Sequence, residues 1–165
     1  MRSRLWLALV VCLAAGTAYA QANLDATVAA HRTDAADIAA IQALLAAYTT
    51  SVGAGDEAAF EALLLSRDIP FSHSGAVSRG QAPETRNYPQ FRQAIFASGK
   101  RYAQTFHNVR ISQDEDLAEV SLDFVTRDLT DGTAGYGWKV LHLLKVKGQW
   151  KIAAEFYTGR ALPKD

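Results

Sequence analysis

The sequence has little sulfur and no excess of charge of either sign. Cys12 is its only cysteine and Met1 its only methionine, and 17 basic side chains balance 17 acidic ones. A lone cysteine cannot form an internal disulfide or supply a metal site built from several thiolates. A nearly neutral chain without basic clusters also argues against nucleic acid or an anionic membrane as a partner.

Sequence motifs for metals, phosphates and acyl transfer are missing as well. The histidines are far apart, with no HxH or HExxH spacing, and the chain contains no phosphate-binding glycine loop and no GxSxG turn. Such motifs supply the ligands and nucleophiles that these sites need. The sequence therefore predicts no metal and no cofactor. The histidines are His31, His73, His107 and His142.

Residues 1–20 have the features of a secretory signal peptide. Arg2 and Arg4 precede an apolar run over residues 5–15, and the AYA at 18–20 is a small-x-small cleavage site. The run is too short to span a bilayer comfortably. We therefore expect cleavage after Ala20, a secreted or periplasmic protein of bacterial type, and no membrane attachment afterwards. Cleavage would also remove Cys12.

Helical patterns follow in the first half of the chain. Residues 21–33 are small and polar, which predicts a flexible leader ahead of a single domain over residues 34–160. Asp34 is an N-cap, and apolar residues at helical spacing predict a helix over 34–51. Asp56 caps a second, short helix, and a third is expected over 88–98, after a loop over 76–87 that could cover a pocket.

The period of the hydrophobic pattern changes to two after Gly99. Strands are predicted over 102–111, 118–128, 136–147 and 150–158, with turns between them. Helices followed by a meander of long strands indicate an α+β fold with an antiparallel sheet.

The segment WKVLHLLKV, residues 138–146, places His142 on a strand that is apolar on both faces. A three-residue turn would pair Val146 with Trp150, Leu144 with Ile152, His142 with Ala154 and Val140 with Phe156. His142 would then face the helices beside the small Ala154. It is either a hydrogen-bonded core residue or a pocket residue. The other face would carry a mixed set that suits a partly solvated surface, and its leucines and tyrosine could bury against a second subunit. That set is Lys139, Leu141, Leu143, Lys145, Lys151, Ala153, Glu155 and Tyr157.

The order of elements resembles the nuclear transport factor 2-like superfamily. The segments AAYTTSVGAGDEAAFEALL, with its GD after the first long helix, and LKVKGQWKIAAEFY carry the resemblance, over residues 34–158. It implies N-terminal helices packed on a strongly curved antiparallel sheet, a cone that encloses a pocket. The superfamily includes ketosteroid isomerases, polyketide cyclases and scytalone dehydratase, and its fold does not specify an activity.

Compared with ketosteroid isomerases, Tyr48 stands eight residues before Asp56, where that family has its oxyanion-donating tyrosine. Sixteen residues after Asp56, in place of the family's catalytic aspartate, this chain has Ser72. His142 falls at the position of the second oxyanion donor. Relatives that use histidine with aspartate suggest instead a set of His73, His142 and Asp123.

Three functions fit these residues. The first is a binding domain, a homodimer through its sheet, that holds a small apolar or aromatic ligand. The second is a cofactor-independent lyase or isomerase that uses His73 or His142 with Tyr48 for acid–base chemistry. An interaction module that binds a partner protein is a third. The residues expected to line the pocket are Phe91, Trp138, Val140, Ala154 and Phe156.

Overall fold

The computed structural model describes residues 24, 26–28, 30–75 and 85–163. The predicted signal peptide with Cys12, part of the leader and most of the loop over 76–87 lie outside the described residues. The chain divides into two units, residues 1–32 and residues 33–165. In the first unit, residues 24 and 26–28 are helical. The second unit contains all the elements described below.

The long helix α2 spans Ala35–Ala54. It begins where predicted, because the Asp34 carboxylate accepts hydrogen bonds from the Ala36 and Asp37 amides. It ends at Gly55, whose φ of 69° is the left-handed cap that glycine favours. The helix is long and apolar enough to meet a composition test for a membrane span. One face of α2 packs in the core, which explains its apolar composition.

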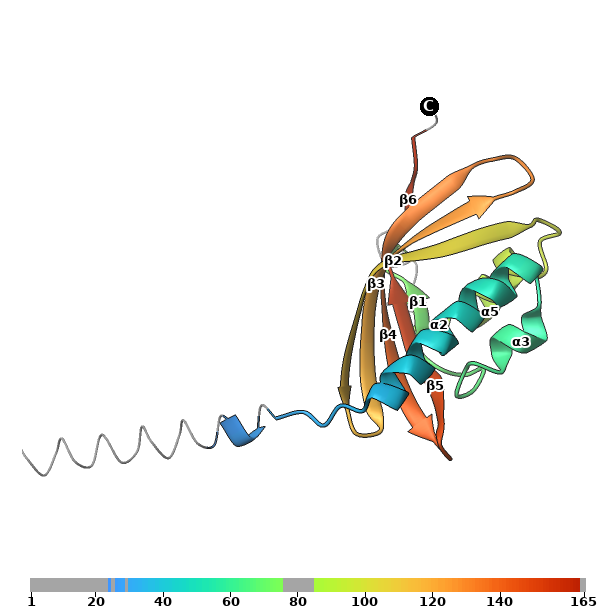
Figure 1. The fold of residues 1–165 in the computed structure, drawn as a ribbon. Coiled ribbons are helices and arrows are strands. Elements are labelled where there is room, and N and C mark those ends of the chain that lie inside the picture. Colours follow the sequence, from blue (N-terminus) through green and yellow to red (C-terminus); the bar gives the residue numbers. More distant parts are fainter. Residues whose placement is uncertain (1–23, 25, 29, 76–84, 164–165) are drawn as a thin grey trace, which may run out of the picture. The chain divides into compact units, whose positions relative to one another are not determined.

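Three short elements follow α2. Helix α3, Glu57–Glu61, is capped by the Asp56 carboxylate, as predicted, and buries Phe60 completely. Strand β1, Phe71–His73, pairs in parallel with the last long strand. Helix α5 spans Tyr88–Ile95 and has proline in its first turn. Figure 1 shows α3 and α5 together beside the C-terminal end of α2.

The sheet has six strands in the order β1-β5-β4-β3-β2, and β6 pairs with β4. The long strands are antiparallel neighbours, as predicted, and β6 is a strand that the sequence pattern did not show. A register shift after His107, beside Asn108 with its φ of 51°, interrupts the pairing of β2 with β3. The bounds are β2 Tyr102–Asp114, β3 Leu117–Asp128, β4 Ala134–Val146, β5 Gln149–Tyr157 and β6 Arg160–Ala161.

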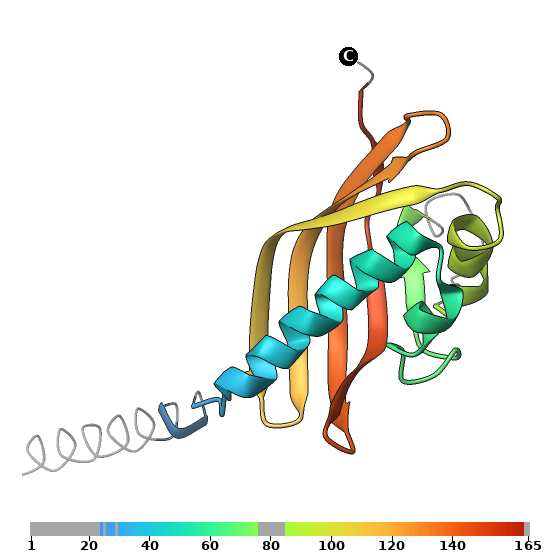
Figure 2. The ribbon, with the colours of Figure 1, turned by 45° about the vertical axis from the view of Figure 1, so that its right-hand side comes forward.

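Helix α2 lies diagonally across the concave face of the curved sheet (Figure 2). The core fills the space between them, and Ile41 of α2, Leu141 of β4 and Ile152 of β5 are fully buried in it. Asp37 ties the start of the helix to the sheet, because its carboxylate accepts hydrogen bonds from Trp150 Nε1 and Lys145 Nζ. The predicted α+β fold with a curved sheet is confirmed.

The β4–β5 hairpin differs from its prediction in register. The turn has two residues, Lys147 and Gly148, both with positive φ, so Val146 pairs with Gln149 and not with Trp150. Leu144 therefore pairs with Lys151. A register shift after His142 then restores the predicted pairs of His142 with Ala154 and Val140 with Phe156.

The predicted orientation of this hairpin is wrong. Leu141 and Leu143 are fully buried on the concave face, whereas His142 is exposed on the convex face. Both faces of β4 carry apolar side chains, so the alternation of residues did not decide which face is buried.

Candidate functional site

Three titratable side chains meet on the concave side of the sheet. Lys139 of β4 donates from Nζ to the Tyr48 hydroxyl of α2 at 2.6 Å and lies 2.7 Å from Glu155 Oε1 of β5. Tyr48 in turn donates to the same oxygen of Glu155 at 3.1 Å. The side chains of Lys139 and Glu155 are 2% and 0% exposed, so this is a buried, closed network.

Burial changes the acid–base properties of all three groups. Loss of water lowers the pKa of Lys139 and raises the pKa of Glu155, while the attraction between the two charges opposes both shifts. Burial, followed by the charge of Glu155, raises the pKa of Tyr48 well above its usual value, so its hydroxyl stays protonated. Burial therefore brings the pKa values of Lys139 and Glu155 closer together than they are in water.

A cavity of about 320 Å³ opens beside Lys139, between α5 and the sheet. Aromatic rings from both elements form its apolar walls, and amide side chains add polar groups. Such a mixture is typical of sites for small molecules, whose volumes run from roughly 300 to 1,000 Å³. The lining residues are His73, Asn87, Gln90, Phe91, Ala94, Ile95, Gln104, Phe124, Thr126, Lys139 and Tyr157.

Gln104 of β2 has a buried polar atom without a hydrogen-bond partner in the described part of the chain. Its Nε2 donates to the Thr126 hydroxyl at 2.7 Å, but its Oε1 has no hydrogen-bond partner among the described residues. Because a buried acceptor without a donor is costly, a ligand group or water is expected there. Glu155 Oε2 is the other such atom in the described part of the chain.

His73 and Asn87 lie at the β1 side of the cavity. The Gly75 amide donates to His73 Nδ1 at 2.8 Å, so a neutral His73 ring carries its proton on Nε2. Asn87 donates from Nδ2 to Ser72 at 3.1 Å. Ser72, at the position of the isomerase base, holds this amide in place and is not among the residues that line the cavity.

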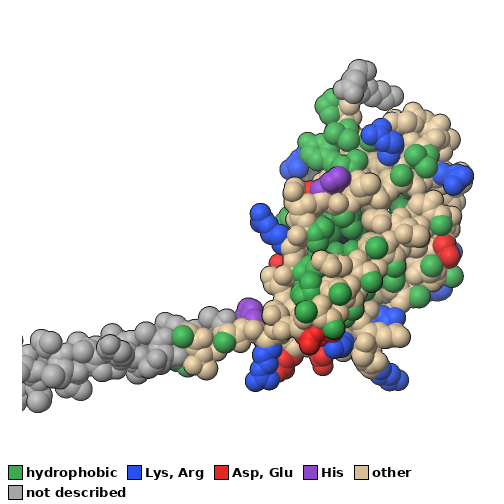
Figure 3. Space-filling view, in the orientation of Figure 1, with side chains coloured by type: hydrophobic (Ala, Val, Ile, Leu, Met, Phe, Trp, Pro, Cys, Tyr) green, Lys and Arg blue, Asp and Glu red, His purple; other side chains and the backbone are tan. Residues whose placement is uncertain are grey.

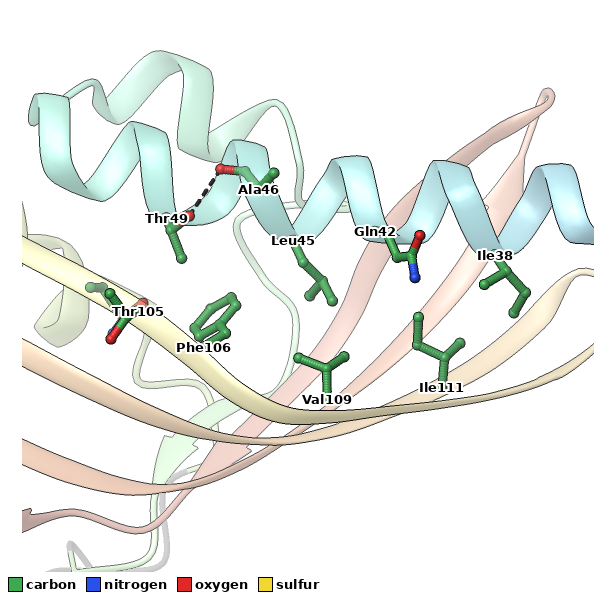
Figure 4. Close-up of a pocket in the computed structure, with 10 residues that line it drawn as sticks. Ile38, Gln42, Leu45, Ala46, Thr49, Thr105, Phe106, Val109 and Ile111 are labelled. Carbon is green, nitrogen blue, oxygen red and sulfur yellow. Dashed lines mark hydrogen bonds between the residues drawn. The ribbon is translucent and has the colours of Figure 1, made fainter.

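A larger groove of about 660 Å³ lies between α2 and β2. Figure 4 shows Ile38 and Leu45 of α2 pointing across it toward the strand that carries Phe106, and Figure 3 shows apolar side chains in a hollow on this side of the molecule. None of its lining residues is ionisable. Gln104 borders both spaces. The groove is lined by apolar and uncharged polar side chains, whereas the smaller cavity is lined in part by ionisable groups.

Several predicted site residues lie on the convex face of the sheet. His142 is exposed there and lies 3.9 Å from Glu119, and Asp123, also exposed, accepts a hydrogen bond from Asn108. Trp138 and Phe156 are 51% and 40% exposed. The same face carries Val140, paired with Phe156, and Ala154, paired with His142. These six residues do not line the cavity, and the predicted set of His73, His142 and Asp123 is not brought together.

Tyr48, His73 and Phe91, also among the predicted site residues, lie on the inner side of the sheet. His73 and Phe91 line the cavity, and Tyr48 lies behind Lys139. Sequence reasoning missed Lys139 and Glu155, which the pattern placed on a partly solvated face. Lys139 lies two residues before Leu141 on the same face of β4, and in the observed register Leu141 pairs with Glu155 and Lys139 with Tyr157. The burial of Leu141 is therefore the signal that could have placed both charged residues on the inner face.

The arrangement combines an aromatic-walled cavity of small-molecule size with the ionisable side chain of Lys139. Within the described residues, no group of three or more histidine, aspartate or glutamate side chains is placed to hold a metal ion.

Comparisons with known proteins agree with this fold. Residues 36–158 match the sequence profile of a family described as "Putative lumazine-binding". No curated protein matches the chain.

Solved structures show the same architecture. A protein of unknown function with a cystatin-like fold from Nostoc punctiforme has a TM-score of 0.60 at 16% identity, over 81% of this chain and 96% of its own. A nuclear transport factor 2-like protein of unknown function from Shewanella baltica has a TM-score of 0.56 at 17% identity, over 81% and 100%.

A protein from Novosphingobium aromaticivorans described as "Putative Scytalone Dehydratase" has a TM-score of 0.56 at 20% identity, over 78% of this chain and 85% of its own. At such identities the structures show a shared fold and not a shared activity. The chain thus has the nuclear transport factor 2-like fold and belongs to the family described as "Putative lumazine-binding".

Proposed function

We propose that this protein binds a small planar aromatic or heteroaromatic molecule in the cavity between α5 and the sheet. The observation that carries the proposal is an aromatic-walled cavity lined by Gln104, a residue whose buried Oε1 has no hydrogen-bond partner among the described residues. A ring that carries N–H or O–H donors would satisfy it and stack on Phe124 or Tyr157. Lumazine, the compound in the family's description, is a flat bicyclic ring with such donors.

Titration of the purified protein with lumazine, followed by calorimetry, tests this. The variant Gln104→Leu removes the acceptor, and we expect affinity to fall roughly tenfold, the effect of about 1–3 kcal/mol for one hydrogen bond to a buried group. Gln149→Leu is the matched control, because Gln149 is exposed at the β4–β5 turn. Equal affinity of the two variants would contradict the proposal.

The geometry supports binding better than the lyase or isomerase alternative. That alternative needs Tyr48 to donate to a ligand and a histidine to act as base. The Tyr48 hydroxyl is already engaged with Lys139 and Glu155 and does not border the cavity, and His142 lies on the convex face. Of the predicted catalytic residues, only His73 lines the cavity.

We also propose that a second copy of the chain covers the convex face. Trp138 and Phe156 are large apolar side chains exposed on neighbouring strands, and Leu144 and Val146 of the same face are 37% and 39% exposed. Surfaces of this kind usually mark an interface. Light scattering should give the mass of a dimer for the protein and of a monomer for Trp138→Glu. Leu129→Glu, in the exposed β3–β4 turn, should stay dimeric; a monomeric parent protein would contradict the proposal.

For the location of the protein we propose secretion or transport to the periplasm. The support is the order of basic, apolar and small residues in residues 1–20. The expected result is that protein recovered from the periplasmic fraction of a bacterial host begins at Gln21. Recovery only in the cytoplasm, with residues 1–20 intact, would contradict it.

A further inference from the structure

Lys139 combines a buried amine, an open cavity and two proton-transfer partners. Its Nζ lies within 2.7 Å of both the Tyr48 hydroxyl and the Glu155 carboxylate, and its side chain also lines the 320 Å³ cavity. We propose that Lys139 is a carbonyl-reactive amine that forms an imine with a small aromatic aldehyde or ketone bound in this cavity. The inference rests on the proposed function, since the carbonyl compound would occupy the same space.

The nucleophile is the unprotonated amine. A lysine in water is almost fully protonated at neutral pH and has no lone pair to donate. Burial lowers the pKa of Lys139, because the surrounding rings solvate an ammonium group less well than water does. Desolvated lysines of this kind are the ones that form imines with carbonyl compounds.

Glu155 is the proton acceptor. Its Oε1 contacts Lys139 Nζ, and its Oε2 is buried with no hydrogen-bond partner in the described part of the chain. Because burial raises the pKa of Glu155, the neutral acid is more accessible than it is at the surface. A carboxylate oxygen without a hydrogen-bond partner has a lone pair that can accept the proton released by Lys139.

The step balances without any oxidant or reductant. The Lys139 ammonium gives one proton to Glu155, and the Nζ lone pair forms a bond to the carbonyl carbon while the C=O π pair moves to oxygen. That oxygen takes a proton from Nζ, which gives a carbinolamine. Glu155 returns its proton to the hydroxyl, the C–O bond breaks, water leaves, and the nitrogen lone pair closes the C=N⁺ bond.

The product, an iminium ion, keeps the positive charge of the lysine side chain. Lys139 Nζ lies 4.3 Å from the centroid of the Tyr48 ring, 5.1 Å from that of Phe124 and 5.6 Å from that of Tyr157. Such faces stabilise a cation, and an iminium ion retains its contact with Glu155. Phe124 and Tyr157 also line the cavity, so they offer stacking surfaces to an aromatic carbonyl compound.

Reductive trapping with benzaldehyde and sodium cyanoborohydride tests the inference. We expect mass spectrometry to find one benzyl group per chain, on Lys139, added at least tenfold faster than at Lys151. Lys151 is a half-buried lysine of the same hairpin that donates a hydrogen bond to the Ala62 carbonyl. Labelling of Lys151 and Lys139 at equal rates, or no label on Lys139, would overturn the proposal.

Two variants test separately whether the cavity gives access to Lys139 and whether the Lys139 amine is the reacting group. Ala94→Trp leaves Lys139 in place but fills the cavity from α5, and it should slow labelling at least tenfold. Lys139→Met combined with Glu155→Met removes the amine without leaving an unpaired buried charge, and it should show no fast labelling. Unchanged labelling of Ala94→Trp would overturn the proposed route to Lys139.

Lumazine binding distinguishes failure of the inference from failure of the proposed function. If lumazine binds but benzaldehyde does not label Lys139, the cavity is a binding site and the imine is excluded. If benzaldehyde labels Lys139 but lumazine does not bind, the imine stands and the proposed class of ligand must change.

Discussion

The two faces of β4 each carry a titratable residue beside a glutamate, and the two pairs differ in almost every respect. On the concave face, Lys139 and Glu155 are 2.7 Å apart with side chains 2% and 0% exposed. On the convex face, His142 and Glu119 are 3.9 Å apart and 53% and 56% exposed. The difference shows what position on the strand does to an ionisable pair: on the concave face, loss of water lowers the pKa of Lys139 and raises the pKa of Glu155.

The largest expected effect comes from breaking the buried pair. Lys139→Met leaves Glu155 as an unpaired buried carboxylate and should lower the free energy of unfolding by about 3–5 kcal/mol. Urea denaturation measures this loss. The double variant with Glu155→Met removes both charges and should recover most of the stability. A loss below about 1 kcal/mol in the single variant would mean that water reaches the pair.

The hairpin register explains why this contrast was not visible in the sequence. The fold class, the caps at Asp34 and Asp56 and the strand order of the meander could be predicted, because they depend on local patterns. The face of β4 could not, because Leu141 and Leu143 alternate with Val140 and Leu144, which are as apolar. The two-residue turn and the bulge after His142 shift the register twice, and no residue pattern marks that bulge.

The site residues follow the same division between local and tertiary information. Tyr48 was predicted to be a site residue because helix spacing and family resemblance place it on the inner face. Lys139 and Glu155 were missed because a lysine and a glutamate on a strand usually indicate a solvated surface. Only the packing of α2 over the sheet makes their positions interior.

A smaller effect is expected from the third member of the network. Tyr48→Phe keeps the ring that packs against Phe60 and Phe106 but removes the hydroxyl that joins Lys139 to Glu155. We expect a loss of about 1–3 kcal/mol, because both charged groups lose one buried hydrogen bond. Urea denaturation measures it, with Tyr136→Phe, at an exposed tyrosine, as the control. No difference between the two variants would contradict a closed network.

The acid sensitivity of the domain should come from surface carboxylates and not from the buried network. Hydrogen bonds from the Thr133 hydroxyl and amide, and then from Lys100, lower the pKa of Asp131 to about 2. A depressed folded-state pKa stabilises the fold above the unfolded value near pH 4, and this contribution is lost as the pH falls toward 2. Asp131→Asn should therefore flatten the pH dependence of the urea midpoint in this window. An unchanged pH dependence of the urea midpoint would show that groups other than Asp131 cause the loss of stability.

The smallest effect is expected on the convex face. His142→Ala removes an exposed side chain whose ion-pair distance to Glu119 is long, and the free energy of unfolding should change by less than about 0.5 kcal/mol. Lumazine affinity, measured by calorimetry, should stay at its original value. A tenfold loss of affinity would show that His142 takes part in binding, against its position on the outside of the sheet.

The most direct test of a concave-face site is a crystal structure of the protein grown with lumazine. The expected result is density for the ring in the cavity bounded by Gln104, Phe124 and Lys139, with a ring donor within hydrogen-bond distance of Gln104 Oε1. Density against Trp138 and His142 on the convex face, with the cavity empty, would contradict the account.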